Sequence, residues 1–211
     1  MSFAKLATVL LALVPAAAQG PLPTLRIEPT AGGSIFYIKN TYSQPVTAYL
    51  VELVDYPGSS FWLWSDFSEG ETIAPGIELR KPISNMTVGA VPDYVKMQAA
   101  IFADGSTAGI PEKVAQLVGR RRAILETVRE LVRRLEKGPA KDAAIADLKS
   151  WSESLPPLSK SAARGQAGFN QGATKAMISR TTSRLGAEPV EKVLADLRAV
   201  EQAVAASKPA L

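Results

Sequence analysis

The stretch IFYIKNTYSQPVTAYLVEL (residues 35–53) decides the fold of the N-terminal half of this chain. Its two ends are rich in β-branched and aromatic side chains, which favour extended strands. The polar residues around Pro45 lie between them and have the composition of a turn. We therefore predict one strand over residues 34–40, a turn, and a second strand over residues 46–54.

Other segments before residue 105 have the same character. FWLW (residues 61–64) and YVKMQAAIF (residues 94–102) are the strongest, and weaker candidates cover residues 25–28, 72–74 and 77–81. About seven short strands with no helix between them favour an antiparallel β-sandwich. In the last segment apolar and polar residues alternate, which predicts one buried and one wet face: Val95, Met97, Ala99 and Ile101 on the first, Lys96, Gln98 and Ala100 on the second.

Residues 22–105 resemble the immunoglobulin-like or fibronectin-like modules of secreted bacterial proteins. The run over residues 35–53, its loop proline Pro45 and the strand over residues 94–102 carry this resemblance. The Cys-Trp-Cys core of antibody-type domains is absent, because the chain has no cysteine. The resemblance implies binding or spacing rather than catalysis and points to no particular ligand.

Beyond Pro111 the apolar residues recur at intervals of three and four, which predicts amphipathic helices. The first runs to Gly138-Pro139, and others cover residues 141–152, 173–185 and 188–206. Three glycines interrupt the pattern over residues 159–172, where we expect a helix to begin between Ser159 and Ala173. The sequence thus predicts an α+β chain with an immunoglobulin-like sandwich (22–105) followed by a helical region (111–207), either a hairpin or a small bundle.

The two halves carry opposite charge. Residues 19–110 hold five Lys/Arg and nine Asp/Glu, a net charge of −4, whereas residues 111–211 hold eighteen and eleven, a net charge of +7. Arg121 lies on the apolar stripe of the long helix and therefore needs a partner, which the acidic half could supply. We predict that the halves attract each other, within one chain or between chains, and that salt loosens their interface. The oligomeric state stays open.

The first eighteen residues have the pattern of a secretory signal peptide. Lys5 precedes an apolar run over residues 6–14, and three alanines end at Ala18. The apolar run is shorter than the roughly 20 residues of a membrane-spanning helix. We predict cleavage of residues 1–18, which leaves a secreted or periplasmic protein that begins at Gln19.

The residue types that are missing exclude several chemistries. The chain has no histidine and no cysteine, so it lacks the usual imidazole base, the thiolate nucleophile and the common soft metal ligands. No glycine-rich phosphate loop is present. We assign no catalytic residue and expect no metal or cofactor.

Trp62 and Trp64 alternate with Phe61 and Leu63, so the two tryptophans share one face of a strand. If exposed, they would form a stacking platform for sugars or a contact for a protein partner. The alternative is that the strand is buried on both faces or covered by the helical half. Three acidic residues follow and are either part of a carbohydrate site or a solvated loop: Asp66, Glu69 and Glu71.

Six arginines give the long helix a dense positive charge: Arg120, Arg121, Arg122, Arg129, Arg133 and Arg134. For an exported protein this indicates anionic partners outside the cytoplasm, such as lipid headgroups, acidic polysaccharide or an acidic protein face, rather than nucleic acid. The alternative is a solvated face with local ion pairs, such as those Glu130 would make.

From these patterns we expect a non-enzymatic binding or structural module whose partner is an extracytoplasmic protein or polysaccharide. The competing interpretations are a carbohydrate-binding or carbohydrate-active protein that uses Trp62, Trp64 and the acidic residues, and a peripheral binder of anionic membranes that uses the arginine-rich helix.

Overall fold

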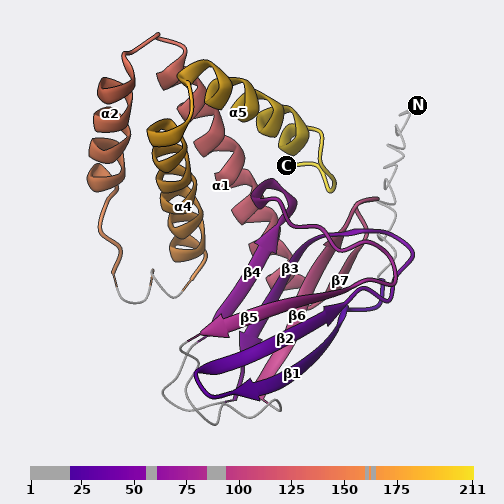
Figure 1. Cartoon of the computed structure of the whole chain (residues 1–211). Coiled ribbons are helices and arrows are strands. Elements are labelled where there is room, and N and C mark those ends of the chain that lie inside the picture. The colour runs from indigo at the N-terminus through magenta and orange to yellow at the C-terminus, as the bar shows by residue number, and fades with distance from the viewer. Residues whose placement is uncertain (1–19, 56–60, 85–93, 160–161, 163–164) are drawn as a thin grey trace, which may run out of the picture.

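The computed structural model describes residues 20–55, 61–84, 94–159, 162 and 165–211. In these residues two antiparallel sheets pack face to face, and four helices follow them along the chain (Figure 1). The α+β class is therefore confirmed. The expected signal peptide, residues 1–18, lies outside the described residues.

The sheets contain three and four strands in the described residues. The smaller sheet has the order β1-β2-β5 and the larger has the order β4-β3-β6-β7, with every neighbouring pair antiparallel. A short 3-10 helix, η1, follows β4. The bounds are β1 (Thr24–Thr30), β2 (Gly33–Lys39), β3 (Val46–Leu53), β4 (Trp62–Asp66), η1 (Phe67–Glu69), β5 (Glu78–Ser84), β6 (Val95–Phe102) and β7 (Thr107–Gly109).

The strands predicted over 34–40, 46–54, 61–64 and 94–102 are confirmed as β2, β3, β4 and β6, and the weaker segments 25–28 and 77–81 overlap β1 and β5. The segment 72–74 does not form a strand, because it makes only an isolated bridge from Ile73 to Val46. The sequence does not predict β7. This strand consists of three small residues beyond position 105 and carries no alternating pattern.

The predicted alternation along β6 is wrong in its second half. The register against β3 shifts between the pairs Leu50–Ala99 and Val51–Met97, so Gln98 is an extra residue in a β-bulge. After the bulge the faces exchange: Ala100 points into the sandwich interior with Met97, whereas Ala99 turns to the outer face. Neither face is wet there, because residues 98–102 are all buried.

The helices are α1 (Pro111–Leu135), α2 (Lys141–Ser154), α4 (Gln166–Ala187) and α5 (Val190–Ala205). Pro111 starts α1 at a position where its missing N–H costs nothing, and Gly138 follows the helix with a φ of 67°. The start of α4 at Gln166 lies inside the predicted interval. Together the helices form a small bundle with its own apolar core, and α5 runs back so that the C-terminus lies beside the sandwich (Figure 1).

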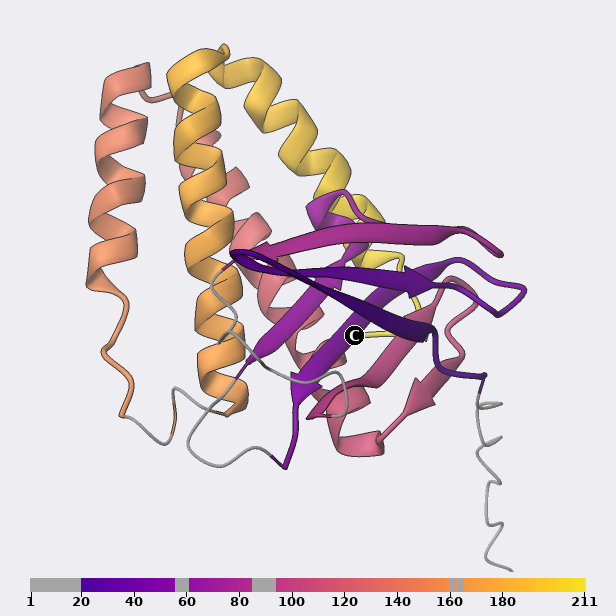
Figure 2. The same cartoon turned by 60° about the horizontal axis from the view of Figure 1, so that its bottom comes forward.

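Helix α1 covers the outer face of the four-stranded sheet, so that sheet is buried on both sides (Figure 2). Leu117 of α1 and Phe169 of α4 pack there against Leu50 and Ile101. Of the two arrangements that the charge pattern left open, within one chain or between chains, the structure shows the first, because the helical region contacts the sandwich of its own chain. This joint between the sandwich and the helices also determines the environment of most candidate site residues.

Gly109 is the last residue of β7, two positions before α1 begins, and its replacement tests how closely the chain packs against β6 there. Its φ is 100°, and an added Cβ would lie 2.1 Å from the carbonyl oxygen of Gln98. We expect Gly109→Ala to lower the free energy of unfolding by about 1–2 kcal/mol for the backbone conformation and by about 1–3 kcal/mol more for the clash. Chemical denaturation measures this loss.

Gly76→Ala is the matched control, because Gly76 has a similar φ of 77° but open space around the added Cβ. Gly76→Ala should lower the free energy of unfolding only by the part that comes from the backbone conformation, about 1–2 kcal/mol. Equal losses in the two variants would show that the contact of Gly109 with β6 adds nothing.

Candidate functional site

The end of β4 and the turn η1 bring the aromatic and acidic candidates to the helices. The strand alternation places Trp62 and Trp64 on the outer face of the larger sheet, whereas Phe61 and Leu63 pack in the sandwich interior. This division of the FWLW segment confirms the prediction from its sequence. The outer face is the one that α1 and α4 cover, so both tryptophans lie at the joint.

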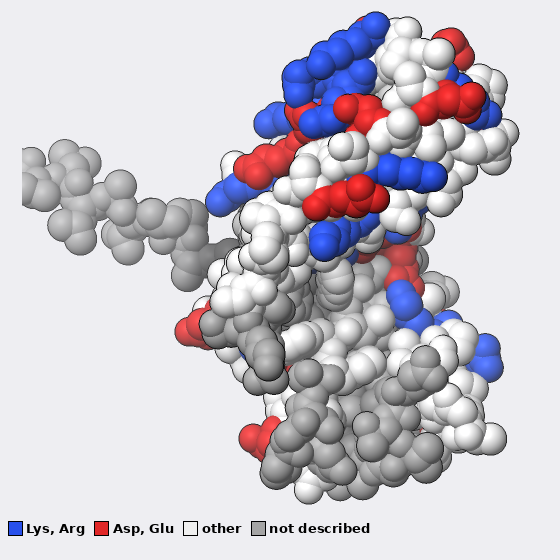
Figure 3. Space-filling view, turned by 90° about the vertical axis from the view of Figure 1, so that its left-hand side faces the viewer, with Lys and Arg blue, Asp and Glu red and all other residues white. Residues whose placement is uncertain are grey.

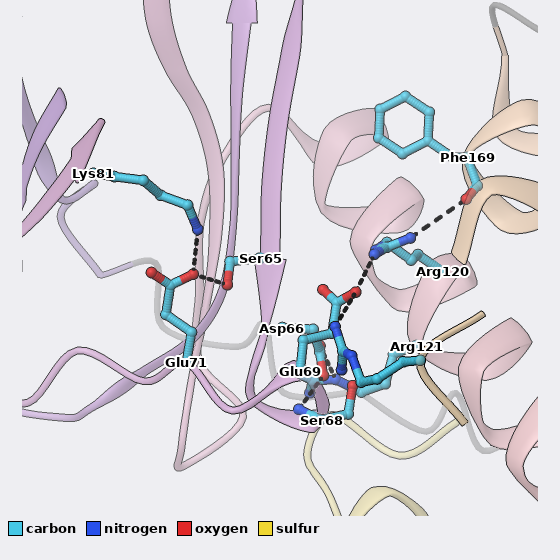
Figure 4. Close-up of polar contacts among 10 residues, drawn as sticks. Ser65, Asp66, Ser68, Glu69, Glu71, Lys81, Arg120, Arg121 and Phe169 are labelled. Atoms are coloured by element: carbon cyan, nitrogen blue, oxygen red, sulfur yellow. Dashed lines mark hydrogen bonds and ion pairs between the residues drawn. The ribbon is translucent and has the colours of Figure 1, made fainter. Parts of the chain in front are cut away.

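Asp66 and Arg121 form a buried ion pair across the joint (Figure 4). The Arg121 Nε donates to Asp66 Oδ2 over 2.8 Å, and the two side chains are 1% and 3% exposed. Arg121 also donates to the backbone carbonyl of Lys208 at 2.8 Å and to the hydroxyl of Thr47 at 3.2 Å. The partner that the sequence required for Arg121 is thus supplied by the acidic half.

Arg120 makes a second ion pair beside the first. Its Nη2 donates to Glu69 Oε1 over 2.8 Å, and its guanidinium carbon lies 3.1 Å from the centre of the Trp64 ring. Burial lowers the pKa of Arg120, and the neighbouring Glu69 opposes that shift. The Arg120 Nε has no hydrogen-bond partner among the described residues. Arg180 approaches the same carboxylate at 3.9 Å, so Glu69 faces two cations.

Phe169 of α4 fills the space between the two tryptophans. Its ring centre lies 5.7 Å from that of Trp62 and 5.5 Å from that of Trp64, and both pairs have inclined geometries. The indole nitrogen of Trp62 donates to Glu52 at 2.9 Å, and Lys113 forms an ion pair with the same carboxylate. Each tryptophan therefore has both an aromatic and a polar neighbour from this chain.

Glu71 lies apart from the arginine pairs, on the side of β4 where the two sheets face each other (Figure 4). It accepts from Lys81 Nζ at 2.6 Å, from the Ser65 hydroxyl and from the Tyr49 hydroxyl at 3.4 Å. Burial raises the pKa of Tyr49 above its ordinary value, with the negative charge of Glu71 as the second cause. The three acidic candidates thus belong to two separate networks.

The outer arginines of α1 are mostly paired. Arg133 and Arg134 both bind Glu130, and Arg134 also binds Asp147 of α2. Figure 3 shows the consequence on this side of the bundle, where basic and acidic side chains alternate. Arg129 pairs with Glu201 of α5. Arg122 is exposed and has no ion pair with any described residue.

No protein-family model, no curated protein and no solved structure matches this chain. Among the described residues, no helix is both long and apolar enough to cross a membrane.

The burial of the ion pair at the joint changes the expected effect of salt on the interface between the two halves. The prediction that salt loosens the interface assumes exposed charges, but Asp66 and Arg121 are almost completely buried. Mobile ions screen such pairs weakly. We now expect salt to act on exposed pairs within the helical bundle, such as Arg129 of α1 with Glu201 of α5, and to leave the buried pair between the two halves intact.

Three of the contributors to the joint that sequence reasoning missed illustrate why: Phe169, Glu52 and Lys113. Phe169 lies in the glycine-rich stretch where the start of α4 is ambiguous, so its helical face was undefined. Glu52 and Lys113 are single charges in otherwise ordinary segments, and only the paired strands and the docked α1 bring them together. The assembled site therefore consists of ion pairs and aromatic contacts that join the sandwich to the helices.

Proposed function

We propose that this chain is a secreted or periplasmic, non-enzymatic binding or structural module, in which an immunoglobulin-like or fibronectin-like sandwich and a helical bundle act as one rigid unit. The strand orders β1-β2-β5 and β4-β3-β6-β7 support the sandwich type. A three-stranded and a four-stranded antiparallel sheet packed together are typical of such modules. The N-terminal signal pattern supports the location.

The ion pair between Asp66 and Arg121 carries this proposal. A ligand-binding or catalytic carboxylate needs access to its ligand, but the side chain of Asp66 is 3% exposed and is bonded to Arg121. Glu69 is similarly committed to Arg120. These charges therefore fit an architectural role, in which they hold the halves together and leave the outer surfaces for a partner.

The competing functions receive less support from the same contacts. A sugar platform needs a free aromatic face, whereas Arg120 covers the ring of Trp64 and Phe169 contacts both tryptophans. A membrane-binding helix needs free cations on one face. Of the six arginines singled out in α1, Arg122 alone lacks an ion pair with the described residues.

The partner class we propose is an extracytoplasmic protein or polysaccharide. The test uses the mature chain from Gln19 as bait on extracytoplasmic material, with parallel samples treated with protease or with glycosidases. We expect saturable binding that one of the two treatments removes, together with mature protein whose N-terminus is Gln19. Protein that stays in the cytoplasm with residues 1–18 attached would contradict the location.

Glycan and liposome binding separate the competing functions, with Trp62→Ala/Trp64→Ala and Arg122→Ala as the respective variants. Glycan binding that the double variant abolishes without loss of folding would replace our proposal with the carbohydrate one. Sedimentation with anionic vesicles that Arg122→Ala abolishes would replace it with the membrane one.

A further inference from the structure

Among the described residues, the two sheets of the sandwich have four edge strands: β1 and β5 in the smaller sheet, β4 and β7 in the larger one (Figure 1). An edge strand presents backbone N–H and C=O groups to any added strand, and proteins usually block such edges with proline, with charge or by keeping the strand short. In an antiparallel pair, bonded and non-bonded positions alternate, and the residues in non-bonded positions direct their backbone groups to the edge. The four edges can therefore be compared residue by residue.

Proline blocks both edges of the smaller sheet. The Asn40 N–H donates to the Ile77 carbonyl just before β5, so by alternation Pro82 is in a non-bonded position and faces the edge. Ser34 of β2 is in a bonded position toward β5, so its partner Pro29 in β1 also faces outward. Proline has no N–H to donate to an added strand.

The edge of β7 is short and already occupied. This strand has three residues, and the Gly20 N–H donates to the carbonyl of Thr107 over 3.1 Å. The segment that leads into β1 therefore lies along this edge, which leaves little room for another strand.

The edge of β4 has no such protection. The Leu53 N–H donates to the Phe61 carbonyl, so by alternation Trp62 and Trp64 direct their backbone groups away from β3. No described residue makes a backbone hydrogen bond to them there. The strand contains no proline, and its register against β3 has no bulge.

Solvent reaches β4 from this edge. The outer face of the larger sheet is covered by α1 and α4, and its inner face by the smaller sheet. Trp62, Leu63 and Trp64 are nevertheless each partly exposed. Their exposure on a sheet covered on both faces is what an open edge produces.

We propose that the edge of β4 binds an extended segment of a partner protein, which adds a fifth strand to the larger sheet. Donors and acceptors that alternate at the spacing of an extended chain fit another polypeptide backbone, and this spacing matches neither a sugar chain nor a membrane surface. The side chains of Trp62, Leu63 and Trp64 are apolar, so we expect β-branched and aromatic residues in the added segment. This inference rests on the proposed function and narrows its partner class to protein.

The probe comes from a display library of random peptides of about eight residues, selected on the mature chain, and amide hydrogen exchange locates its binding. We expect selected peptides to slow exchange at Trp62 and Trp64, whose amides face the edge, and to change Leu63 and Ser65 little. Absence of selected peptides, or binding without this protection, overturns the proposal. Protection that rises with protein concentration in the absence of peptide overturns it in favour of a second copy of the chain.

Two substitutions at Trp62 remove the same indole but differ in one backbone N–H. Trp62→Val keeps this N–H, whereas Trp62→Pro lacks it, as Pro29 and Pro82 do at the other edges. Position 62 makes no backbone bond to β3, so both variants should fold, which circular dichroism checks. We expect Trp62→Pro to bind the selected peptides about ten-fold more weakly than Trp62→Val.

Equal binding of the peptides by the two variants would contradict the docking edge. Failure to capture any partner from extracytoplasmic material would contradict the proposed function, whereas a captured partner that binds both variants equally would contradict only this edge.

Discussion

Asp66→Ala should lower the free energy of unfolding by about 3–5 kcal/mol, because it leaves the Arg121 guanidinium buried without its counter-ion. The loss is large because both side chains are almost completely buried, with Arg121 Nε 2.8 Å from Asp66 Oδ2. Asp66 also accepts from the backbone of Ser68 in η1. Asp66→Asn keeps that local cap and separates the two contributions, and urea unfolding of the three proteins measures them.

The matched control for this prediction is an exposed ion pair. Asp147 binds Arg134 through two hydrogen bonds, but its side chain is 52% exposed. Asp147→Ala should therefore lose no more than about 1 kcal/mol. Similar losses for Asp66→Ala and Asp147→Ala would show that the Asp66 pair does not stabilise the joint.

Phe169→Ala should lower the free energy of unfolding by about 3–5 kcal/mol, because it opens a cavity between the helices and β4. Phe169 is 8% exposed and contacts both Trp62 and Trp64. We also expect the tryptophan emission of the folded variant to shift to longer wavelength, since water gains access to the two indoles. Denaturant unfolding and steady-state fluorescence give the two readouts.

Ile77→Ala is the control for this loss of apolar volume, because Ile77 is 55% exposed and should cost well under 1 kcal/mol. Phe169→Leu should retain much of the packing, so its loss of unfolding free energy should lie between those of Ile77→Ala and Phe169→Ala. If Phe169→Ala has the same emission spectrum and the same free energy of unfolding as the unmodified protein, Phe169 has no packing role at the joint.

Local pattern predicts most of the fold. The alternation of β-branched and aromatic residues locates β2, β3, β4 and β6, and the three-and-four spacing locates the helices. The pattern fails where one residue changes the geometry, as at Gln98, whose bulge exchanges the faces of β6. It also fails at β7, which is three residues long and is defined by its pairing with β6 rather than by its own composition.

One part of the candidate site could be predicted from the sequence, because a buried charged side chain requires a partner of opposite charge. Arg121 lies on an apolar stripe, and a buried guanidinium needs a carboxylate, so an acidic partner followed from the sequence. Which carboxylate it would be did not follow, because Asp66 is fifty-five residues away. The contact of Arg120 with Trp64 depends in the same way on how α1 docks, which no local pattern records.

The central claim is that the sandwich and the helices form one unit, and thermal unfolding of Trp151→Phe tests it most directly. In this variant fluorescence reports only Trp62 and Trp64 at the joint, whereas circular dichroism at 222 nm reports mainly the helices. We predict that both signals change at the same midpoint in one cooperative transition. Two separate midpoints, with the helices unfolding while the tryptophans remain in their folded environment, would contradict it.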